Sequence, residues 1–381
     1  MTKQHWMGVI VGILVTGAVQ AQVGQLEWHK GITLPAMQDG KVHIGMAGPI
    51  AGVTGDCFLV AGGANFPHLP PWEGGAKEIQ KDVFIYGKER EGLSLIARDS
   101  LPAAVSYAAS LSLPDGLLVI GGETPEGKTA ICRLIKYDGS TKKITVSDFP
   151  NLPFPLANMG AVIHGNKLFI AGGEMSDAVS DQVLQLDLAH LEKGWVCVGR
   201  LPYAVSHLQL LSDSQHGLYL LGGRKAHPES PSTLYHELWC STDGGSTWSK
   251  RTDIPFPAAA GTACVLPDQG IWLLSADRGN TFHQVEALIF DAKKEANLSK
   301  RQKLIDAKNK LQINHPGFGK EVWRYDLKSA KWKRMGDLPS DGPVTTTAVV
   351  WGNMIILPSG EIKAGVRTPE ILVATFSKKW D

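Results

Sequence analysis

The sequence predicts an all-β protein built as a six-bladed β-propeller, and three observations lead to this prediction. A glycine pair, or a degenerate form of one, ends an apolar strand at six places, mostly 50 to 59 residues apart. A tryptophan precedes a proline by seven residues in several of these units. The two ends of the chain each carry part of one further unit. A period of this size is typical of propeller blades with four short strands each.

The strand ends share four apolar residues followed by the pair. The six pairs are Gly62-Gly63, Gly121-Gly122, Gly172-Gly173, Gly222-Gly223, the degenerate Ser275-Ala276, and Ser359-Gly360 after Pro358. Each pair is expected to end the second strand of a blade, so the fifth blade carries the weakest signal.

The tryptophans confirm the phase of the repeat. Trp195, Trp248 and Trp332 each lie seven residues before a proline that follows Leu or Ile. We expect the tryptophan to lie on an outer strand and to pack between blades, and the proline to mark the crossing to the next blade, where strand pairing ends. A glycine pair, then an aromatic residue, then a tryptophan resembles the kelch repeat.

The two chain ends predict how the ring closes. Trp28 precedes Pro35 by the same seven residues, but no glycine pair lies upstream of it. The C-terminal unit has a strand over residues 371–376 but lacks a tryptophan strand. The strand around residues 26–29 is therefore expected to complete the last blade, which removes two exposed sheet edges.

One segment breaks the period. Residues 292–319 are rich in Lys, Ala, Leu and Asn, and Leu298, Leu304, Ile305 and Leu311 recur at roughly helical spacing. We interpret this segment as a helical insertion between two strands of the fifth blade. Two roles stay open for it: a cap over a pocket, or a solvated surface helix.

The N-terminus reads as an export signal. Lys3 and His5 precede an apolar run over residues 6–19, and Val19-Gln20-Ala21 offers small residues at a cleavage site. The run is too short for a membrane span, which needs roughly 20 residues. Residues 1–21 are thus expected to be a signal peptide, and residues 22–381 a single propeller, located in the periplasm or secreted.

Charge and cysteine usage exclude several classes. Removal of Lys3 lowers the net charge from +1 to 0, which gives no support for a nucleic-acid partner. A small-molecule partner is expected instead, with no membrane contact after signal cleavage. Five widely spaced cysteines predict single buried thiols rather than a disulfide framework, and no zinc-binding spacing occurs.

The loops that follow each glycine pair and each Leu-Pro should meet around one mouth of the central channel. His207 and Asn158 follow Leu-Pro positions, and Glu73 lies in the long first-blade loop. The polar residues that follow the glycine pairs are Asn65, Glu123, Glu174, Arg224, Arg278, Glu361 and Arg367. Carboxylates and guanidinium groups together suit an anionic sugar, because arginine binds a carboxylate with two parallel hydrogen bonds.

The C-terminal loop carries a specific resemblance. Its sequence Gly-Glu-Ile-Lys-Ala-Gly-Val-Arg-Thr, residues 360–368, resembles the signature loop of the bacterial N-acetylneuraminate epimerases, which are sialic acid mutarotases. The stretches 61–66, 73–74, 118–124 and 127–128 are similar to other parts of that family, as is the Lys-rich insertion before residues 323–326. The familiar family order places the loop mid-chain, so this chain resembles a cyclically permuted member.

The resemblance implies roles for particular residues. Glu361 matches the family's catalytic glutamate and Arg367 its arginine. It implies that Glu361 moves protons during ring opening and closure, and that Arg367, together with Arg224, holds the substrate carboxylate. Asn65, Glu73, Glu123, Glu174 and Arg278 are the further candidates for substrate binding. No metal, nucleotide or other cofactor is required for such a reaction.

Two other functions stay open. The stretch 241–248, Ser-Thr-Asp-Gly-Gly-Ser-Thr-Trp, matches the Asp-box of sialidase propellers, which favours a glycoside hydrolase. A sialidase would need three arginines, for which Arg224, Arg278 and Arg367 supply the number, and a Tyr-Glu pair, for which no tyrosine is evident. A kelch propeller that binds glycans without catalysis is the second alternative, since a fold does not define a function.

Overall fold

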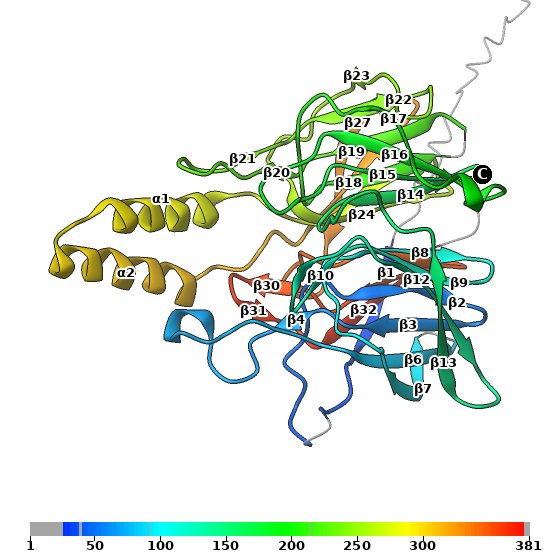
Figure 1. The fold of residues 1–381 in the computed structure, drawn as a ribbon, viewed down its shortest axis with the longest axis horizontal. Coiled ribbons are helices and arrows are strands. Elements are labelled where there is room, and N and C mark those ends of the chain that lie inside the picture. Colours follow the sequence, from blue (N-terminus) through cyan, green and yellow to red (C-terminus); the bar gives the residue numbers. More distant parts are fainter. Residues whose placement is uncertain (1–25, 38–39, 91, 214, 377–381) are drawn as a thin grey trace, which may run out of the picture.

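The computed structural model describes residues 26–37, 40–90, 92–213 and 215–376, and the predicted signal segment 1–21 lies outside them. Within these residues six four-stranded antiparallel sheets form the blades of a propeller, which confirms the predicted fold class (Figure 1). In the part of the chain that is described, no helix is long and apolar enough to cross a membrane.

The first three blades each use four strands in chain order. Blade one contains β2 (Ile50–Thr54), β3 (Cys57–Ala61), β6 (Asp82–Lys88) and β7 (Leu93–Ser100). Blade two contains β8 (Ala109–Leu113), β9 (Gly116–Ile120), β12 (Cys132–Asp138) and β13 (Lys143–Phe149). Blade three contains β14 (Gly160–His164), β15 (Lys167–Ala171), β16 (Gln182–Asp187) and β17 (Val196–Arg200).

The next three blades follow the same plan, except at the ends of the chain. Blade four contains β18 (Gln209–Asp213), β19 (Gly217–Leu221), β22 (Leu238–Ser241) and β23 (Ser249–Lys250). Blade five contains β24 (Ala259–Leu266), β25 (Gly270–Asp277), β26 (Glu321–Asp326) and β27 (Lys331–Asp337). Blade six contains β28 (Val349–Trp351), β29 (Met354–Pro358), β32 (Glu370–Phe376) and β1 (Leu26–Thr33).

Short hairpins extend the connection between the second and third strands in four blades. They are β4 (Ala64–Asn65) with β5 (Glu78–Ile79), β10 (Glu123–Thr124) with β11 (Gly127–Lys128), β20 (Arg224–Lys225) with β21 (Thr233–Leu234), and β30 (Glu361–Lys363) with β31 (Val366–Arg367). The first of these hairpins also encloses the short 3₁₀ helix η1 (Pro71–Glu73), whereas η2 (Leu191–Lys193) lies in blade three.

The ring closes as predicted. Strand β1 pairs with β32 from the other end of the chain, with Leu26 opposite Phe376 and Trp28 opposite Ala374. The two strands lie side by side in Figure 1. The last blade therefore cannot form until the whole chain is present, and β1 covers the outer edge of β32.

Blade five carries the helical insertion, but its bounds differ from the prediction. Helix α1 (Asn280–Lys294) and helix α2 (Leu298–Ile313) form a hairpin between β25 and β26, and this hairpin projects from one side of the propeller (Figure 1). The predicted segment began at residue 292 and missed α1. The first part of α1 carries Phe282, Val285 and Ile289, which are aromatic or β-branched, so it lacks the Lys- and Ala-rich composition of a surface helix.

The apolar second strands fill the core between neighbouring blades. All five residues of β9, of β19 and of β29 are buried. Two outer tryptophans form hydrogen bonds to the preceding blade. The Nε1 of Trp195 donates to the Pro150 carbonyl at 2.9 Å. The Nε1 of Trp332 donates to the Thr252 carbonyl at 2.9 Å. All five cysteines are free thiols, and Cys197 is exposed rather than buried.

The glycine pairs have a steric cause. Gly172 has a φ of 64°, and a Cβ placed on it would lie 2.2 Å from the carbonyl oxygen of Val205 in the next segment. The N–H of Gly173 donates to the same oxygen at 2.8 Å. Equivalent contacts occur at Gly62, Gly121 and Gly222. The pair therefore lets the chain that enters the next blade approach the end of the second strand.

A left-handed backbone conformation and the close approach of a carbonyl oxygen both favour glycine, and the two effects can be separated within blade three. Gly165 has a φ of 60°, but no atom lies within 4 Å of the position that a Cβ would take there, whereas a Cβ on Gly172 would meet the Val205 carbonyl. Gly165→Ala should lower the free energy of unfolding by about 1 kcal/mol, the usual penalty for a left-handed residue. Gly172→Ala should lower it by about 2–4 kcal/mol, because overpacking adds to that strain.

Denaturant unfolding of both variants beside the wild type measures the difference. Equal losses for the two variants would show that close approach is not the reason for the glycine pair.

Candidate active site

A closed ring of backbone hydrogen bonds forms the floor of the candidate site. One residue from each blade donates its N–H to the carbonyl of the corresponding residue in the preceding blade, at distances from 2.6 to 3.0 Å. Gly48 donates to Thr345 and so joins the first blade to the last. The six residues are Gly48, Tyr107, Asn158, His207, Ala260 and Thr345. They are called the floor ring below.

All six floor-ring residues have left-handed backbone conformations, with φ between 49° and 60°. Such a conformation costs an ordinary residue about 1 kcal/mol or more, and it persists only where the surroundings enforce it. The ring's hydrogen bonds provide that constraint. Residues held this way are characteristic of functional sites, and the side chains of Tyr107, Asn158 and His207 line the space above the floor.

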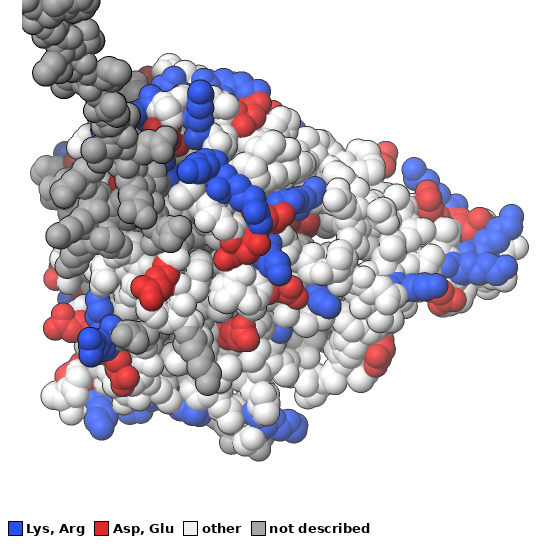
Figure 2. All heavy atoms as spheres, turned by 180° about the vertical axis from the view of Figure 1, so that it is seen from behind, with Lys and Arg blue, Asp and Glu red and all other residues white. Residues whose placement is uncertain are grey.

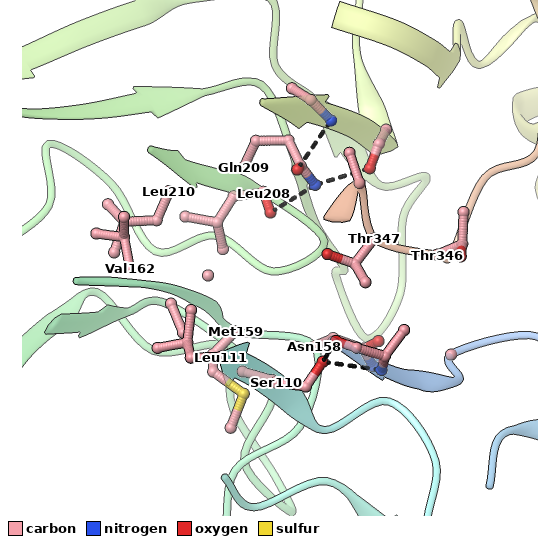
Figure 3. Close-up of a pocket in the computed structure, with 18 of the residues that line it drawn as sticks. Ser110, Leu111, Asn158, Met159, Val162, Leu208, Gln209, Leu210, Thr346 and Thr347 are labelled. Atoms are coloured by element: carbon pink, nitrogen blue, oxygen red, sulfur yellow. Dashed lines mark hydrogen bonds between the residues drawn. The ribbon is translucent and has the colours of Figure 1, made fainter. Parts of the chain in front are cut away.

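Below the floor ring runs the central channel, with a volume of about 310 Å³. Its described lining contains no Asp, Glu, Lys or Arg side chain. Figure 3 shows the apolar and small polar side chains that face it, among them Leu111, Met159 and Thr347. Gln209 bridges two blades there: its Nε2 donates to the Gly261 carbonyl at 2.7 Å. The channel therefore contributes packing between the blades, and its described lining supplies no charged side chain.

Above the floor ring lies a cavity of about 450 Å³. The end of each second strand reaches it at one equivalent position, because that residue pairs with the residue immediately before the floor ring in the same blade. The six pairs are Ala47 with Ala64, Ser106 with Glu123, Ala157 with Glu174, Ser206 with Arg224, Ala259 with Asp277, and Val344 with Glu361. Five of these six strand ends carry an ionisable side chain, and all five line the cavity.

Five of the predicted residues are therefore brought together. The lining includes Glu361 and Arg367, and also Glu123, Glu174 and Arg224. Asn158 and His207, which follow Leu-Pro positions, line it too. These residues come from the second, third, fourth and sixth blades, so the site exists only in the closed ring.

Arg278 does not line the cavity, and this corrects the sequence interpretation. The register places Asp277 at the position equivalent to Glu361, one residue earlier than predicted. Successive residues of a strand point to opposite faces. Arg278 therefore faces away, where it pairs with Glu321 at 2.7 Å and lies 4.0 Å above the Phe256 ring. Counting from the degenerate pair Ser275-Ala276 would have found Asp277.

Asn65 and Glu73 also lie outside the cavity. Asn65 is buried, and its side chain binds the Gly45 carbonyl at 3.0 Å and the Gln80 side chain at 3.0 Å, so it stabilises the first-blade loop. Glu73 ends the 3₁₀ helix η1 and is exposed. The long first-blade loop contributes Phe66 and Lys77 to the cavity instead.

Glu361 and Arg367 face each other across the β30–β31 hairpin. The Glu361 Oε1 accepts a hydrogen bond of 2.6 Å from the N–H of Gly365 and lies 3.6 Å from the NH1 of Arg367. The Arg367 guanidinium lies 4.6 Å above the Phe66 ring and is only 6% exposed. The hairpin therefore fixes a carboxylate and a guanidinium beside one another.

Both arginines that line the cavity have side-chain nitrogens without a hydrogen-bond partner in the described structure, and so does the Nε of Arg278 outside it. The Nε and NH1 of Arg367, and the Nε of Arg224, are buried and unpaired. Leaving a buried donor unpaired costs about 1–3 kcal/mol, and more where the group is charged. Both side chains line the cavity, so an anion bound there would satisfy them.

Tyr107 was missed by the sequence interpretation. It lines the cavity from the floor ring, and Lys77 lies 5.1 Å above its ring. Burial raises the pKa of the Tyr107 phenol to about 12, although Arg367 opposes the shift. The phenol therefore stays protonated near neutral pH and acts as a hydrogen-bond donor. Sequence reasoning missed it because its position follows from the floor ring and not from a motif.

Glu174, His207 and Arg224 form a second group on the opposite side of the cavity. Glu174 accepts hydrogen bonds from Arg224 at 3.3 Å, Asn158 at 3.2 Å and Ser206 at 3.2 Å. Burial favours a higher pKa for Glu174, but the charge and hydrogen bond of Arg224 hold it below its usual value. Burial and the Arg224 charge lower the pKa of His207 to about 3, so this imidazole is neutral at neutral pH.

The helical insertion caps the cavity, which settles the role left open by the sequence. Thr281, Phe282 and Val285 of α1 line the cavity, as do Gln312 of α2 and Phe318 beyond it. The N–H of Phe318 donates to the Ile362 carbonyl at 3.1 Å, so the insertion is joined to the β30–β31 hairpin. Figure 2 shows that Lys and Arg side chains gather instead at the outer end of the hairpin, away from the cavity.

The fold and the cavity define a class: a six-bladed propeller whose capped mouth presents carboxylates and two arginines with nitrogens that lack a hydrogen-bond partner. In the described residues no group of three or more His, Cys, Asp or Glu side chains is arranged to hold a metal ion.

Comparison with known proteins adds the family. The profile of the N-acetylneuraminate epimerase family matches residues 13–145 and 149–381, and the chain belongs to this family. The N-acetylneuraminate epimerase of Salmonella typhimurium is 26% identical over 235 residues, which are 61% of this chain and 58% of that protein. The N-acetylneuraminate epimerase of Brucella suis is 34% identical over 136 residues, 33% of this chain and 34% of that protein. The alignments thus span at most a little over half of those relatives.

The Glu174 network predicts a pH-dependent contribution to stability. The pKa of Glu174 is lower in the folded protein than in the unfolded chain, where it is near 4.5. The ionised carboxylate therefore stabilises the fold at a pH above 4.5, and this contribution is lost as the pH falls through the folded pKa. Glu174→Gln should therefore lower the free energy of unfolding by about 1–2 kcal/mol at pH 7. The difference from wild type should shrink below about pH 4.

Thermal unfolding between pH 3 and 7 tests this, with Glu126→Gln as an exposed control. A stability loss that is the same at every pH would contradict the ionised state of Glu174.

Proposed function

We propose that this protein is a mutarotase that interconverts the α and β anomers of N-acetylneuraminate. One observation carries the proposal: the guanidinium nitrogens of Arg367 that lack a hydrogen-bond partner belong to a side chain that lines the same cavity as the Glu361 carboxylate. The substrate is a sugar acid whose carboxylate is attached directly to the anomeric carbon. A carboxylate bound to Arg367 therefore brings the anomeric hydroxyl close to Glu361.

The binding step uses the two arginines. Arg367 is held by the β30–β31 hairpin and by the Phe66 ring, so it needs little ordering when the substrate arrives. Arg224 reaches the cavity from the fourth blade and keeps its Nε for a ligand. Both sites lie under the helical cap, where burial strengthens an ion pair relative to water.

The chemical step needs a base at the anomeric hydroxyl. Glu361 takes that proton as the bond between the anomeric carbon and the ring oxygen breaks, an acid protonates the ring oxygen, and an open-chain ketone results. Rotation about the bond beside the ketone presents its other face. Glu361 then returns a proton to the new anomeric oxygen when the ring closes. The hydrogen bond from the Gly365 N–H orients the carboxylate for both transfers.

The cavity fits a sialidase less well. Arg224 and Arg367 line the cavity, whereas Arg278 is held outside it by Glu321, so the described lining lacks a third arginine. Tyr107 is near Glu361 and Arg367, but its raised pKa disfavours the phenolate that a tyrosine nucleophile requires. The Asp-box residue Asp243 accepts hydrogen bonds from Thr247 and Ser241 within its own turn, which is a structural role.

Export is part of the proposal. The apolar run and small-residue site within residues 1–21 support signal cleavage and action in the periplasm or outside the cell.

The reaction is tested by proton NMR exchange between the anomers of N-acetylneuraminate. Wild-type protein should accelerate the exchange above the spontaneous rate. Glu361→Gln should lose about 10²–10⁴-fold of that acceleration, because the amide keeps the bond from Gly365 but cannot accept the proton. Glu73→Gln, which changes an exposed glutamate outside the cavity, is the matched control and should retain the wild-type rate. Binding without any acceleration by wild type would instead support a glycan-binding propeller.

Arg367 is tested by its effect on substrate affinity. Arg367→Lys keeps a positive charge but cannot form two parallel hydrogen bonds with a carboxylate. The KM for N-acetylneuraminate should rise about 10-fold or more, since charge-assisted hydrogen bonds contribute about 1.5–3 kcal/mol. The neutral analogue in which the carboxylate is an amide should show little difference between wild type and variant. An unchanged KM for the acid would place the carboxylate elsewhere.

A further inference from the structure

Asp277 holds the same place in blade five that Glu361 holds in blade six. Each directly follows the glycine pair of its blade or the degenerate form of that pair, and each pairs with the residue just before the floor ring: Asp277 with Ala259, and Glu361 with Val344. Strand pairing thus brings both carboxyl groups to the same level above the floor ring. The two blades are neighbours, and both side chains line the same cavity.

One oxygen of Asp277 is committed to the backbone and the other is not. Its Oδ1 accepts a hydrogen bond of 2.8 Å from the N–H of Gly279, just before α1. Within the described residues, its carboxyl group makes no other hydrogen bond. The helical cap therefore fixes the orientation of the carboxyl group, while the second oxygen stays available to a ligand in the cavity.

The surroundings of Asp277 favour its protonated form. Burial raises the pKa of this carboxyl group, and the neighbouring Glu361 charge raises it further. The hydrogen bond from Gly279 and the groups Arg224 and His283 oppose the shift but do not cancel it. Two carboxyl groups in different surroundings within one cavity are the arrangement that lets one act as acid and the other as base.

The other carboxylates of the cavity are already engaged. Glu123 forms an ion pair with Lys77, with both oxygens 2.9 Å from its Nζ. Glu174 accepts hydrogen bonds from three neighbouring side chains. Asp277 is thus the carboxyl group beside Glu361 that retains an oxygen free for substrate.

We propose that Asp277 is the general acid that protonates the ring oxygen of the sugar while Glu361 deprotonates the anomeric hydroxyl. This inference rests on the proposed mutarotase function and supplies the proton that ring opening requires. It makes the catalytic site a pair contributed by adjacent blades, in which the helical cap holds the acid.

The proton balance closes over one turnover. In ring opening, the O–H bond of the anomeric hydroxyl breaks and its proton goes to Glu361. The electron pair forms the ketone C=O, the bond from the anomeric carbon to the ring oxygen breaks, and that oxygen takes the proton of Asp277. In ring closure, Asp277 takes the proton back as the hydroxyl attacks the other face of the ketone, and Glu361 protonates the new anomeric oxygen. Both groups end in their starting states.

The test compares wild type with Asp277→Asn, Asp277→Glu and Arg278→Lys. Asparagine keeps an oxygen that can accept from Gly279 but has no acidic proton, and glutamate restores the acid. Arg278→Lys changes the next residue, which points out of the cavity, and keeps a partner for Glu321. Anomer exchange of N-acetylneuraminate is measured by NMR as a function of pH, and substrate affinity by calorimetry.

Asp277→Asn should lose about 100-fold or more in kcat, the usual contribution of a general acid, with substrate affinity within about twofold of wild type. The wild-type rate should fall at high pH as Asp277 ionises, and this limb should be absent in Asp277→Asn. Asp277→Glu should recover part of the rate, and Arg278→Lys should equal wild type.

Two results overturn the proposal. If Asp277→Asn keeps its rate within about threefold, or keeps the high-pH limb, Asp277 is not the acid, although the mutarotase function stands. If wild type itself does not accelerate exchange, the proposed function fails, and the role of Asp277 fails with it.

Discussion

The floor ring is the constraint on which the site depends. Its six backbone hydrogen bonds run once around the channel, and the last of them, from Gly48 to Thr345, joins the first blade to the sixth. Five of its members are non-glycine residues in left-handed conformations, which Tyr107, Ala260 and Thr345 do not favour by themselves. The pairing of β1 with β32 closes the same ring at its outer side. A propeller opened at either point would no longer hold the ionisable side chains of the cavity at one level above the floor ring.

That common level explains how residues far apart in sequence form one charged cavity. In every blade the residue after the glycine pair, or after its degenerate form, pairs with the residue just before the floor ring, and in five blades its side chain lines the same cavity. The position is variable in chemistry but fixed in place: alanine, glutamate, arginine or aspartate occupies it. The helical insertion then covers this set of charges, and the hydrogen bond from Phe318 to Ile362 connects it to the β30–β31 hairpin. Enclosure makes the unpaired donors of Arg367 and Arg224 strong sites for an anion.

The repeat, the blade number and the closure by both termini could be predicted from sequence, because the glycine pairs and tryptophans report steric needs that recur in every blade. Glu361 and Arg367 were also found, through the loop they share. Asp277 and Tyr107 were not, for different reasons. The degenerate pair Ser275-Ala276 obscured the register of blade five by one residue, which exchanged Asp277 for Arg278. Tyr107 is set in place by the floor ring, a contact between blades that leaves no motif. The start of the cap was missed because α1 is apolar on the side that faces the cavity.

A crystal structure of the Glu361→Gln variant with N-acetylneuraminate bound would test the central claim most directly. The account predicts that the substrate carboxylate lies on the guanidinium of Arg367, with at least one N–O distance near about 3 Å. It also predicts that the anomeric hydroxyl faces residue 361 and the ring oxygen faces Asp277. A sugar bound in the uncharged channel below the floor ring, or one whose carboxylate points to the helical cap and away from both arginines, would contradict it.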